Sequence, residues 1–222
     1  MRKIILSILF VLMAVVMVGE DNIALAVKVE GQVNLTRNKK VNTIETGSGL
    51  QNKDYLESKS DSYAAVKFVD GSSIVKLFPN SNLYLNVEKE EDKLNKKSRL
   101  TVGKVWSKVM KKTGAFEVET PTTVVSVKGT DFLISVDENK ETDIFTFSGT
   151  VAAKNKEDNR VVEIPPGYKV HSTGKGIMEV REIKGDDIDE ETRKIMEDAS
   201  NIMEIEMENP EGETRDIEIE FE

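Results

Sequence analysis

Cysteine is absent from the 222 residues, and histidine occurs once, as His171. The absence of cysteine excludes disulfides, thiolate metal sites and a lipid anchor on cysteine, so the core alone must stabilise the folded chain. A single histidine excludes catalytic histidine pairs and metal sites made of several histidines. The G-x-S-x-G, Walker and G-x-G-x-x-G motifs are missing as well. We therefore predict a protein that is not an enzyme, with no catalytic residues, no metal site and no cofactor.

Carboxylates are the one catalytic group that counting does not exclude. Glycosidases use a pair of Asp or Glu side chains in a cleft, and Asp131 and Asp143 fall in the central strand-rich region. The plainer interpretation is that both are exposed residues at strand ends. A carbohydrate-active enzyme on a β-scaffold therefore stays as a third hypothesis, which two facing carboxylates would support.

No apolar run reaches the roughly 20 residues of a membrane-spanning helix. The longest is the uncharged segment 4–18, which follows a positively charged N-terminal pair. The Ala24-Leu25-Ala26 triplet then matches the A-x-A pattern of a cleavage site and places the mature start at Val27. Residues 1–26 are therefore predicted to be a signal peptide, and the product to be exported, hence periplasmic or extracellular (secreted). An uncleaved signal is the alternative and would be its only contact with a membrane.

The formal net charge of -9 is unevenly distributed. Residues 27–178 contain 24 Lys and Arg against 20 Asp and Glu, whereas residues 179–222 contain 5 against 18. The acidity therefore belongs to the C-terminal segment. Since no part of the chain is strongly basic, we expect no nucleic-acid partner.

Between residues 27 and 178, about a dozen short alternating runs rich in Val, Ile, Thr and Phe are separated by glycine-containing turns. This pattern, without a helical period, predicts an all-β sandwich, roll or barrel. The clearest unit is 63–77, where Asp70-Gly71 predicts a hairpin with positive φ at both turn residues. Its register would place Val66 opposite Val75. The charge-dense segment 88–99 is expected to be a solvated loop.

The single tryptophan, Trp106, has two interpretations. Packing in the core or at its rim is the plainer one, and a stacking platform for a ligand is the other. Lys108 follows it closely, and Asp131 lies in the central region. We take Trp106, Lys108 and Asp131 as candidate contact residues for a ligand or partner.

A series of motifs follows in a fixed order along residues 43–170. It resembles the FecR domain family, whose later motifs read V-x-T-P, then GT-x-F, then G-x-V and finally P-G. The matching pieces are residues 63–77, 100–106, 116–121, 127–132, 147–151 and 166–170. The resemblance implies an extracytoplasmic all-β module of bacterial signalling proteins. It also implies that the signature residues determine turns and fold, not chemistry: Asp70, Gly71, Pro121, Gly129, Thr130, Phe132, Gly149 and Gly167.

The start of the chain departs from the best-known role of this family. In that role an inner-membrane protein passes a signal from an outer-membrane receptor to a cytoplasmic sigma factor, through a cytoplasmic N-terminal segment. Here only three residues precede the apolar run. We therefore expect a stand-alone exported FecR-like protein that lacks the cytoplasmic anti-sigma segment.

The C-terminal segment 179–222 is predicted to form an acidic helix over 186–199 and an acidic hairpin from the alternating runs 202–207 and 217–221. The apolar stripe of the helix is made by Ile188, Thr192, Ile195 and Ala199. The plainer expectation is that this segment packs on the β-domain or is partly disordered. The sharper one is an acidic appendage that docks on a basic partner or collects divalent cations.

Two functional hypotheses follow from these features. The first is a non-enzymatic exported binding or signalling module of the cell envelope, which contacts an envelope protein or a cell-surface polymer such as a glycan. The alternative is a structural component of the envelope or of a surface assembly, in which the acidic tail mediates association. Fold resemblance alone does not decide between them.

Overall fold

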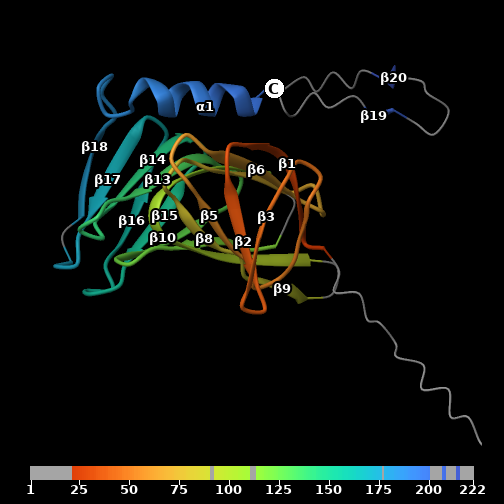
Figure 1. The fold of residues 1–222 in the computed structure, drawn as a ribbon. Helices are drawn as coiled ribbons and strands as arrows, with labels where there is room; N and C mark the ends of the chain where they lie inside the picture. Colours follow the sequence, from red (N-terminus) through yellow and green to blue (C-terminus); the bar gives the residue numbers. More distant parts are fainter. Residues whose placement is uncertain are drawn as a thin grey trace, which may run out of the picture.

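The computed structural model describes residues 22–90, 93–110, 114–176 and 178–200, together with the strand pair at 207–208 and 214–215 (Figure 1). Eighteen of its strands form one continuous hydrogen-bonded system, which folds into two layers. The fold is therefore all-β, as predicted, with one short helix. Among the described residues, no helix has the length and apolar character needed to cross a membrane.

The first layer, sheet A, has its strands in the spatial order β4-β1-β6-β7-β10-β13-β14-β17-β18, all antiparallel. The bounds are β1 Ala24–Glu30, β4 Gly49–Leu50, β6 Tyr63–Phe68, β7 Ser73–Leu77, β13 Asp131–Val136, β14 Thr142–Ser148, β17 Tyr168–Ser172 and β18 Met178–Glu182.

The second layer, sheet B, has the order β3-β2-β5-β8-β10-β11-β12-β15-β16, with β9 paired to the start of β10. The bounds are β2 Val33–Arg37, β3 Lys40–Thr43, β5 Tyr55–Ser58, β8 Asn82–Tyr84, β9 Val87–Glu90, β10 Lys93–Val109, β11 Phe116–Glu119, β12 Thr123–Val127, β15 Val151–Asn155 and β16 Val161–Ile164.

Strand β10 belongs to both layers. Its residues up to 102 pair with β8 and β9 in sheet B, and its residues from Gly103 onward pair with β13 and then β7 in sheet A. Gly103 has φ +90, and a Cβ there would lie 2.2 Å from Ser81 Oγ. Only glycine adopts this backbone beside so close a neighbour, so Gly103 marks the bend between the two sheets.

The core lies between the two sheets and is made of their inward-facing residues. The ring of Phe116 meets those of Phe68 and Phe132 edge to face, with centroids 6.5 and 6.1 Å apart. These rings come from both layers, so their packing joins the sheets. Sheet A also buries its outer face, because helix α1 (Glu190–Ser200) lies over it (Figure 1).

The predicted hairpin at 63–77 has the predicted register, with Val66 opposite Val75. The predicted turn type is wrong. Gly71 has φ +66, but Asp70 does not have positive φ, and the Gly71 N–H donates to the Phe68 carbonyl. The four-residue connection between β6 and β7 thus needs positive φ only at its glycine.

The prediction of a solvated loop at 88–99 is also wrong, because β9 and β10 form a hairpin there. Lys96 is only 1% exposed, and its Nζ lies 2.6 Å from Asp70 Oδ2. The inward positions Leu94, Lys96, Ser98 and Leu100 alternate as in any strand. Because Lys96 occupies one of these inward positions, the sequence of this segment does not show the apolar alternation of a strand.

Both predicted boundaries of the β-domain fall inside strands. Strand β1 begins at Ala24, and Ala24 and Ala26 are fully buried against β6. Cleavage before Val27 stays a prediction, and it would remove the first three residues of this strand. The boundary at residue 178 lies at the start of β18, which pairs with β17.

The predicted C-terminal helix begins four residues later than expected. Asp189 caps it, since its Oδ1 accepts the Thr192 N–H at 2.7 Å, and α1 starts at the next residue. Beyond it, β19 (Met207–Glu208) pairs with β20 (Thr214–Arg215). Most of the predicted hairpin strands, and the side chain of Ala199, lie outside the described residues.

Candidate binding surface

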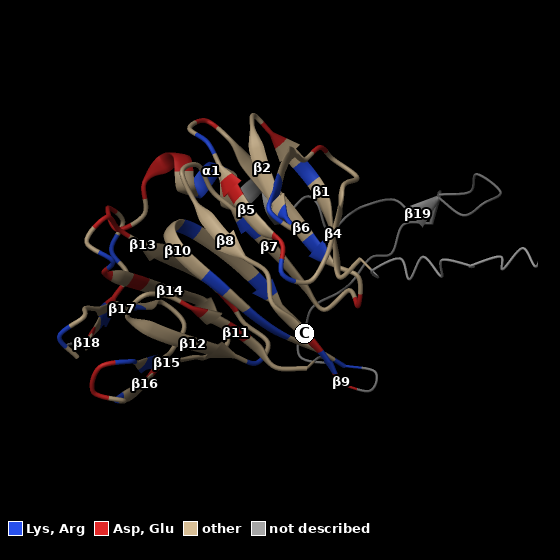
Figure 2. Ribbon diagram, turned by 60° about the horizontal axis from the view of Figure 1, so that its bottom comes forward, with Lys and Arg blue, Asp and Glu red and all other residues tan. Residues whose placement is uncertain are grey.

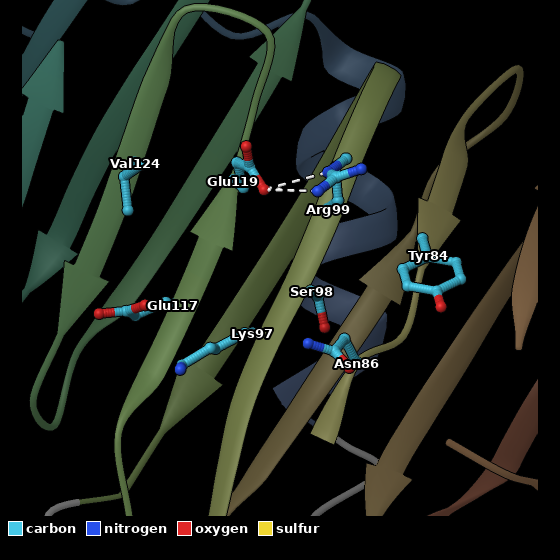
Figure 3. Close-up of a pocket in the computed structure, with 8 residues that line it drawn as sticks. All are labelled: Tyr84, Asn86, Lys97, Ser98, Arg99, Glu117, Glu119 and Val124. Atoms are coloured by element: carbon cyan, nitrogen blue, oxygen red, sulfur yellow. Dashed lines mark hydrogen bonds and ion pairs between the residues drawn. The ribbon is translucent and has the colours of Figure 1, made fainter. Parts of the chain in front are cut away.

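A shallow hollow lies on the outer face of sheet B, where β8, β10, β11 and β12 run side by side (Figure 3). Its volume is about 200 Å³, less than the roughly 300–1,000 Å³ of usual small-molecule pockets. It is lined by Tyr84, Asn86, Lys97, Ser98, Arg99, Glu117, Glu119 and Val124. A hollow of this size fits one side chain or one sugar unit of a larger molecule.

The charges of the hollow come from a parallel strand pair within an otherwise antiparallel sheet. β10 and β11 run parallel, so Lys97 lies opposite Glu117 and Arg99 opposite Glu119. Because side chains two residues apart share a face, all four point outward. Figure 3 shows the guanidinium of Arg99 directed at Glu119, with an Nη2–Oε2 distance of 3.0 Å.

Ion pairs hold the charges of this face in place. Burial would raise the pKa of Glu119, but hydrogen bonds from Lys156, at 2.5 Å, and Arg99 outweigh it and lower the pKa. The hydrogen bond that Lys97 donates to Glu88 is the main reason why the pKa of Lys97 is raised. Both groups are therefore charged at neutral pH, and the hollow presents charges of both signs beside a tyrosine and an amide.

Two carboxylates two residues apart on one strand lie roughly 7 Å from each other, a spacing that glycosidases also use. Glu117 and Glu119 have this relationship. A general acid, however, needs a raised pKa, whereas that of Glu119 is lowered by two cations. The arrangement suits binding of polar groups better than proton transfer.

The other pair, Asp131 and Asp143, is not brought together. Asp143 pairs with Ser135, four residues along β13 from Asp131, which is roughly 13 Å at 3.3 Å per residue. This exceeds the roughly 5–9.5 Å between the carboxyl groups of glycosidases. Asp143 also contacts Lys169 at 3.1 Å and His171 at 3.2 Å, and the described residues bring together no His, Asp and Glu cluster suited to a metal ion.

The candidate contact residues chosen from the sequence lie on the outer face of sheet A, not in the hollow. Lys108 is opposite Asp131, and Trp106 is opposite Leu133. Trp106 is 4% exposed and packs in a second apolar cluster, so it is no open stacking platform here. Burial raises the pKa of Asp131, although Trp106 and Lys108 oppose this effect.

The family-signature residues lie at turns and in the core. Gly129 and Gly149 both have φ +71, and a Cβ on Gly149 would lie 2.3 Å from the Gly129 carbonyl oxygen. Gly167 has φ +83, while Thr130 and Phe132 are buried. The structure thus places these positions away from the hollow, as it does Asp70, Gly71 and Pro121, which follow strands β6 and β11.

Sequence reasoning missed a buried hydroxyl network around Pro121. The Thr142 hydroxyl lies 2.9 Å from that of Thr120 and 2.8 Å from that of Thr122. Thr123 and Asn155 both donate to the Ser172 hydroxyl. These contacts join sheet B to β14 and β17 of sheet A, and the run of threonines beside Pro121 was the available signal.

The two sheets are joined through strand β10, which belongs to both, and the protein is therefore an all-β module. The model of the FecR family, described as FecR protein, matches residues 54–152. This segment, which is less than half of the chain, is similar to the FecR family, as the motifs in it indicated.

Two crystal structures of a candidate anti-sigma factor from Parabacteroides distasonis ATCC 8503 share the fold, each with a TM-score of 0.51. Their sequences are 16% and 17% identical to this chain, and the alignment covers 64% of it. It covers 62% of the other chain, so this protein spans less than two thirds of that length. No curated protein sequence matches the chain.

Proposed function

We propose that this protein is an exported, non-enzymatic FecR-like module that binds an envelope protein or a cell-surface polymer through the outer face of sheet B. The FecR match and the fold shared with a candidate anti-sigma factor support a role in signalling. The apolar run and the A-x-A triplet at the N-terminus support export.

The observation that carries this proposal is the hollow around Arg99 and Glu119. Its charged groups are paired across neighbouring strands, so a ligand meets donors and acceptors of both signs close together. Tyr84 adds an aromatic ring at the side (Figure 3). Such a surface suits a glycan unit or a polar peptide segment.

Affinity capture from envelope extract tests the proposal. The bait is the exported chain, compared with a double variant, Lys97→Ala with Arg99→Ala, and with Lys175→Ala as the matched control. Lys175 is an exposed lysine in the turn between β17 and β18, away from the hollow. We expect one specific protein or glycan to be retained by the parent and the control and lost by the double variant. Equal retention by all three would place the binding site elsewhere.

The structural-assembly alternative has one observation in its favour, the acidic segment that packs on sheet A. A truncation after Ile183 tests it, because β18 ends at Glu182 and stays intact. Self-association in sedimentation that disappears with the truncation, with nothing retained from the extract, would favour assembly. A monomer that keeps its ligand after truncation would favour the binding module.

A further inference from the structure

A second surface of the molecule is already occupied by a part of the chain itself. Residues 183–196, which we call the strap, lie over the outer face of sheet A (Figures 1 and 2). Its apolar side chains pack on a cluster in which Trp106 is central. That contact consists of Ile183, Ile188, Ile195 and Met196 on the strap, and of Ile74, Phe78, Trp106, Leu133, Phe145 and Phe147 on the sheet.

Two acidic groups of the strap, close together just before helix α1, meet cations of sheet A. Asp187 accepts hydrogen bonds from Arg181, one of them at 2.7 Å, and lies 3.4 Å from Lys169. At the helix start, Lys104 Nζ lies 2.5 Å from Asp189 Oδ2. Figure 2 shows the acidic stretch leading into α1 in red. The charges of strap and sheet are therefore complementary.

Two lysines beneath the strap contact it. Lys76 is fully buried and donates to the backbone carbonyl of Ile195, near the C-terminal end of the described strap. Lys169 is 8% exposed, and its Nζ lies 4.6 Å from the centre of the Phe145 ring. A buried ammonium group is costly unless it is paired. The strap offers Lys76 a carbonyl oxygen, and it adds the Asp187 carboxylate to the Asp143 carboxylate with which sheet A already pairs Lys169.

The strap is held separately from the main core. The core between the sheets contains no strap residue, and the FecR match ends at residue 152. Ile188 and Ile195 are only half-buried, and the Lys104–Asp189 pair is 35% and 53% exposed. Exposed ion pairs contribute little to stability, and the core between the two sheets keeps its own contacts if the strap leaves.

We propose that the outer face of sheet A is a docking site for an acidic amphipathic helix of a partner protein, and that the strap is an internal ligand which that helix displaces. The strap defines the chemistry of the occupant: an aspartate before the helix, a second aspartate at its N-cap, and isoleucines seven residues apart, as at Ile188 and Ile195. This site is distinct from the hollow on sheet B. A partner on one sheet therefore does not compete with a ligand on the other.

The probe is a fluorescently labelled peptide with the sequence of residues 183–200, titrated against the full chain. The test variant is Asp187→Asn with Asp189→Asn, which weakens the strap but keeps a good helix cap, since Asn caps as well as Asp. We expect the peptide to bind this variant about tenfold more tightly than the parent, because its own strap competes less. Adding Lys104→Glu should abolish the gain.

Trp106, the only tryptophan, reports whether the face is open. Its emission should shift to the red in the double variant and return on addition of the peptide. A peptide with both aspartates replaced by asparagine is the control and should bind weakly. A second copy of the chain that inserts its own strap, seen as an exchanged dimer, would show the same site filled by the same chemistry and would support the proposal.

The truncation after Ile183 covers the case in which the double variant keeps its strap closed. A folded truncated chain with exposed Trp106 should bind the peptide most tightly of all. Failure of that folded chain to bind the peptide overturns the proposal. Loss of folding on truncation overturns it as well, because the strap would then be a part of the fold and not a ligand.

Discussion

The outer faces of the two sheets differ in how they are completed. On sheet A, aromatic residues such as Trp106 and Phe145 lie among lysines, and the strap covers them. On sheet B, Lys97 and Arg99 alternate with inward residues, and they pair with Glu88 of β9 and Glu119 of β11. An antiparallel sheet tolerates one wet face only when that face is polar. The comparison shows that the apolar content of each face decides which one needs a cover.

The largest effect is expected at the bend that carries β10 from one sheet to the other. Gly103→Ala should reduce the free energy of unfolding by about 3 kcal/mol, because φ +90 is strained and the Cβ meets Ser81. Urea unfolding followed by circular dichroism measures it. Gly71→Ala is the control, with φ +66 and open space around its Cβ. It should cost about 1 kcal/mol, and equal losses would contradict the clash.

The next largest effect concerns a contact between the layers. Lys96→Met should cost about 2 kcal/mol, since it removes the partner of Asp70, whose side chain is 20% exposed. Burial raises the pKa of Asp70, but hydrogen bonds from Lys96 and Ser72 lower it below the ordinary 3.8. This stabilisation is present above about pH 4 and is lost as the pH falls below it.

The pH profile of unfolding distinguishes this ion pair from simple packing. In the parent, stability should fall as Asp70 is protonated below its ordinary pKa of 3.8, and in Lys96→Met this part of the profile should flatten. A double variant, Lys96→Met with Asp70→Asn, should recover part of the loss. A parallel profile in parent and variant would mean that Lys96 acts through its aliphatic stem alone.

Acid should open the face of sheet A. Burial raises the pKa of Asp189, but hydrogen bonds from Lys104 and Thr192 lower it to about 2, and the pKa of Asp187 is lowered as well, mainly by Arg181. The strap contacts are therefore complete above about pH 4 and are lost as the pH falls towards 2. Trp106 emission should shift over this window and stay constant from about pH 5 to 8.

The charge-neutral strap, Asp187→Asn with Asp189→Asn, provides the control for this titration. Its Trp106 emission should already be shifted at neutral pH and should respond less to acid. A transition between pH 5 and 7 in the parent would point to groups other than these two aspartates.

The smallest stability effects are expected for the exposed ion pairs, one on each face. Arg99→Ala and Lys104→Ala should each change the free energy of unfolding by less than about 1 kcal/mol. Their consequences differ in kind, because only Lys104→Ala should increase quenching of Trp106 by acrylamide, and only Arg99→Ala should weaken capture of the envelope ligand. An identical response from both variants would remove the distinction between the faces.

The sequence predicted those parts of the fold in which local pattern and burial agree. The hairpin at 63–77 is such a case, since its apolar face meets the core in the predicted register. The prediction failed where a charged side chain points inward. Lys96 made the first half of β10 resemble a loop, and the candidate binding surface lies on that same half. Its partners, Glu117 and Glu119, are brought there by a parallel pairing that no local pattern reveals.

The covered face was predicted only in outline. The sequence favoured a packed Trp106 and a C-terminal segment that packs on the β-domain, but it did not show that the one covers the other. The residues that cover Trp106 lie about eighty positions later in the chain. The apolar stripe of the helix predicted which side of the helix is buried, but not which strands that side contacts. Long-range packing of this kind depends on the shape of the assembled sheet.

The continuous strand β10 has a consequence for how the molecule unfolds. Among the described residues, strand pairing links the first half of sheet B to its second half, and β7 to β13 in sheet A, only through β10. Neither layer can therefore melt and leave the other intact. Heat should therefore produce one sharp unfolding transition, with equal calorimetric and van't Hoff enthalpies. A substitution that destabilises one sheet should lower the melting temperature of both.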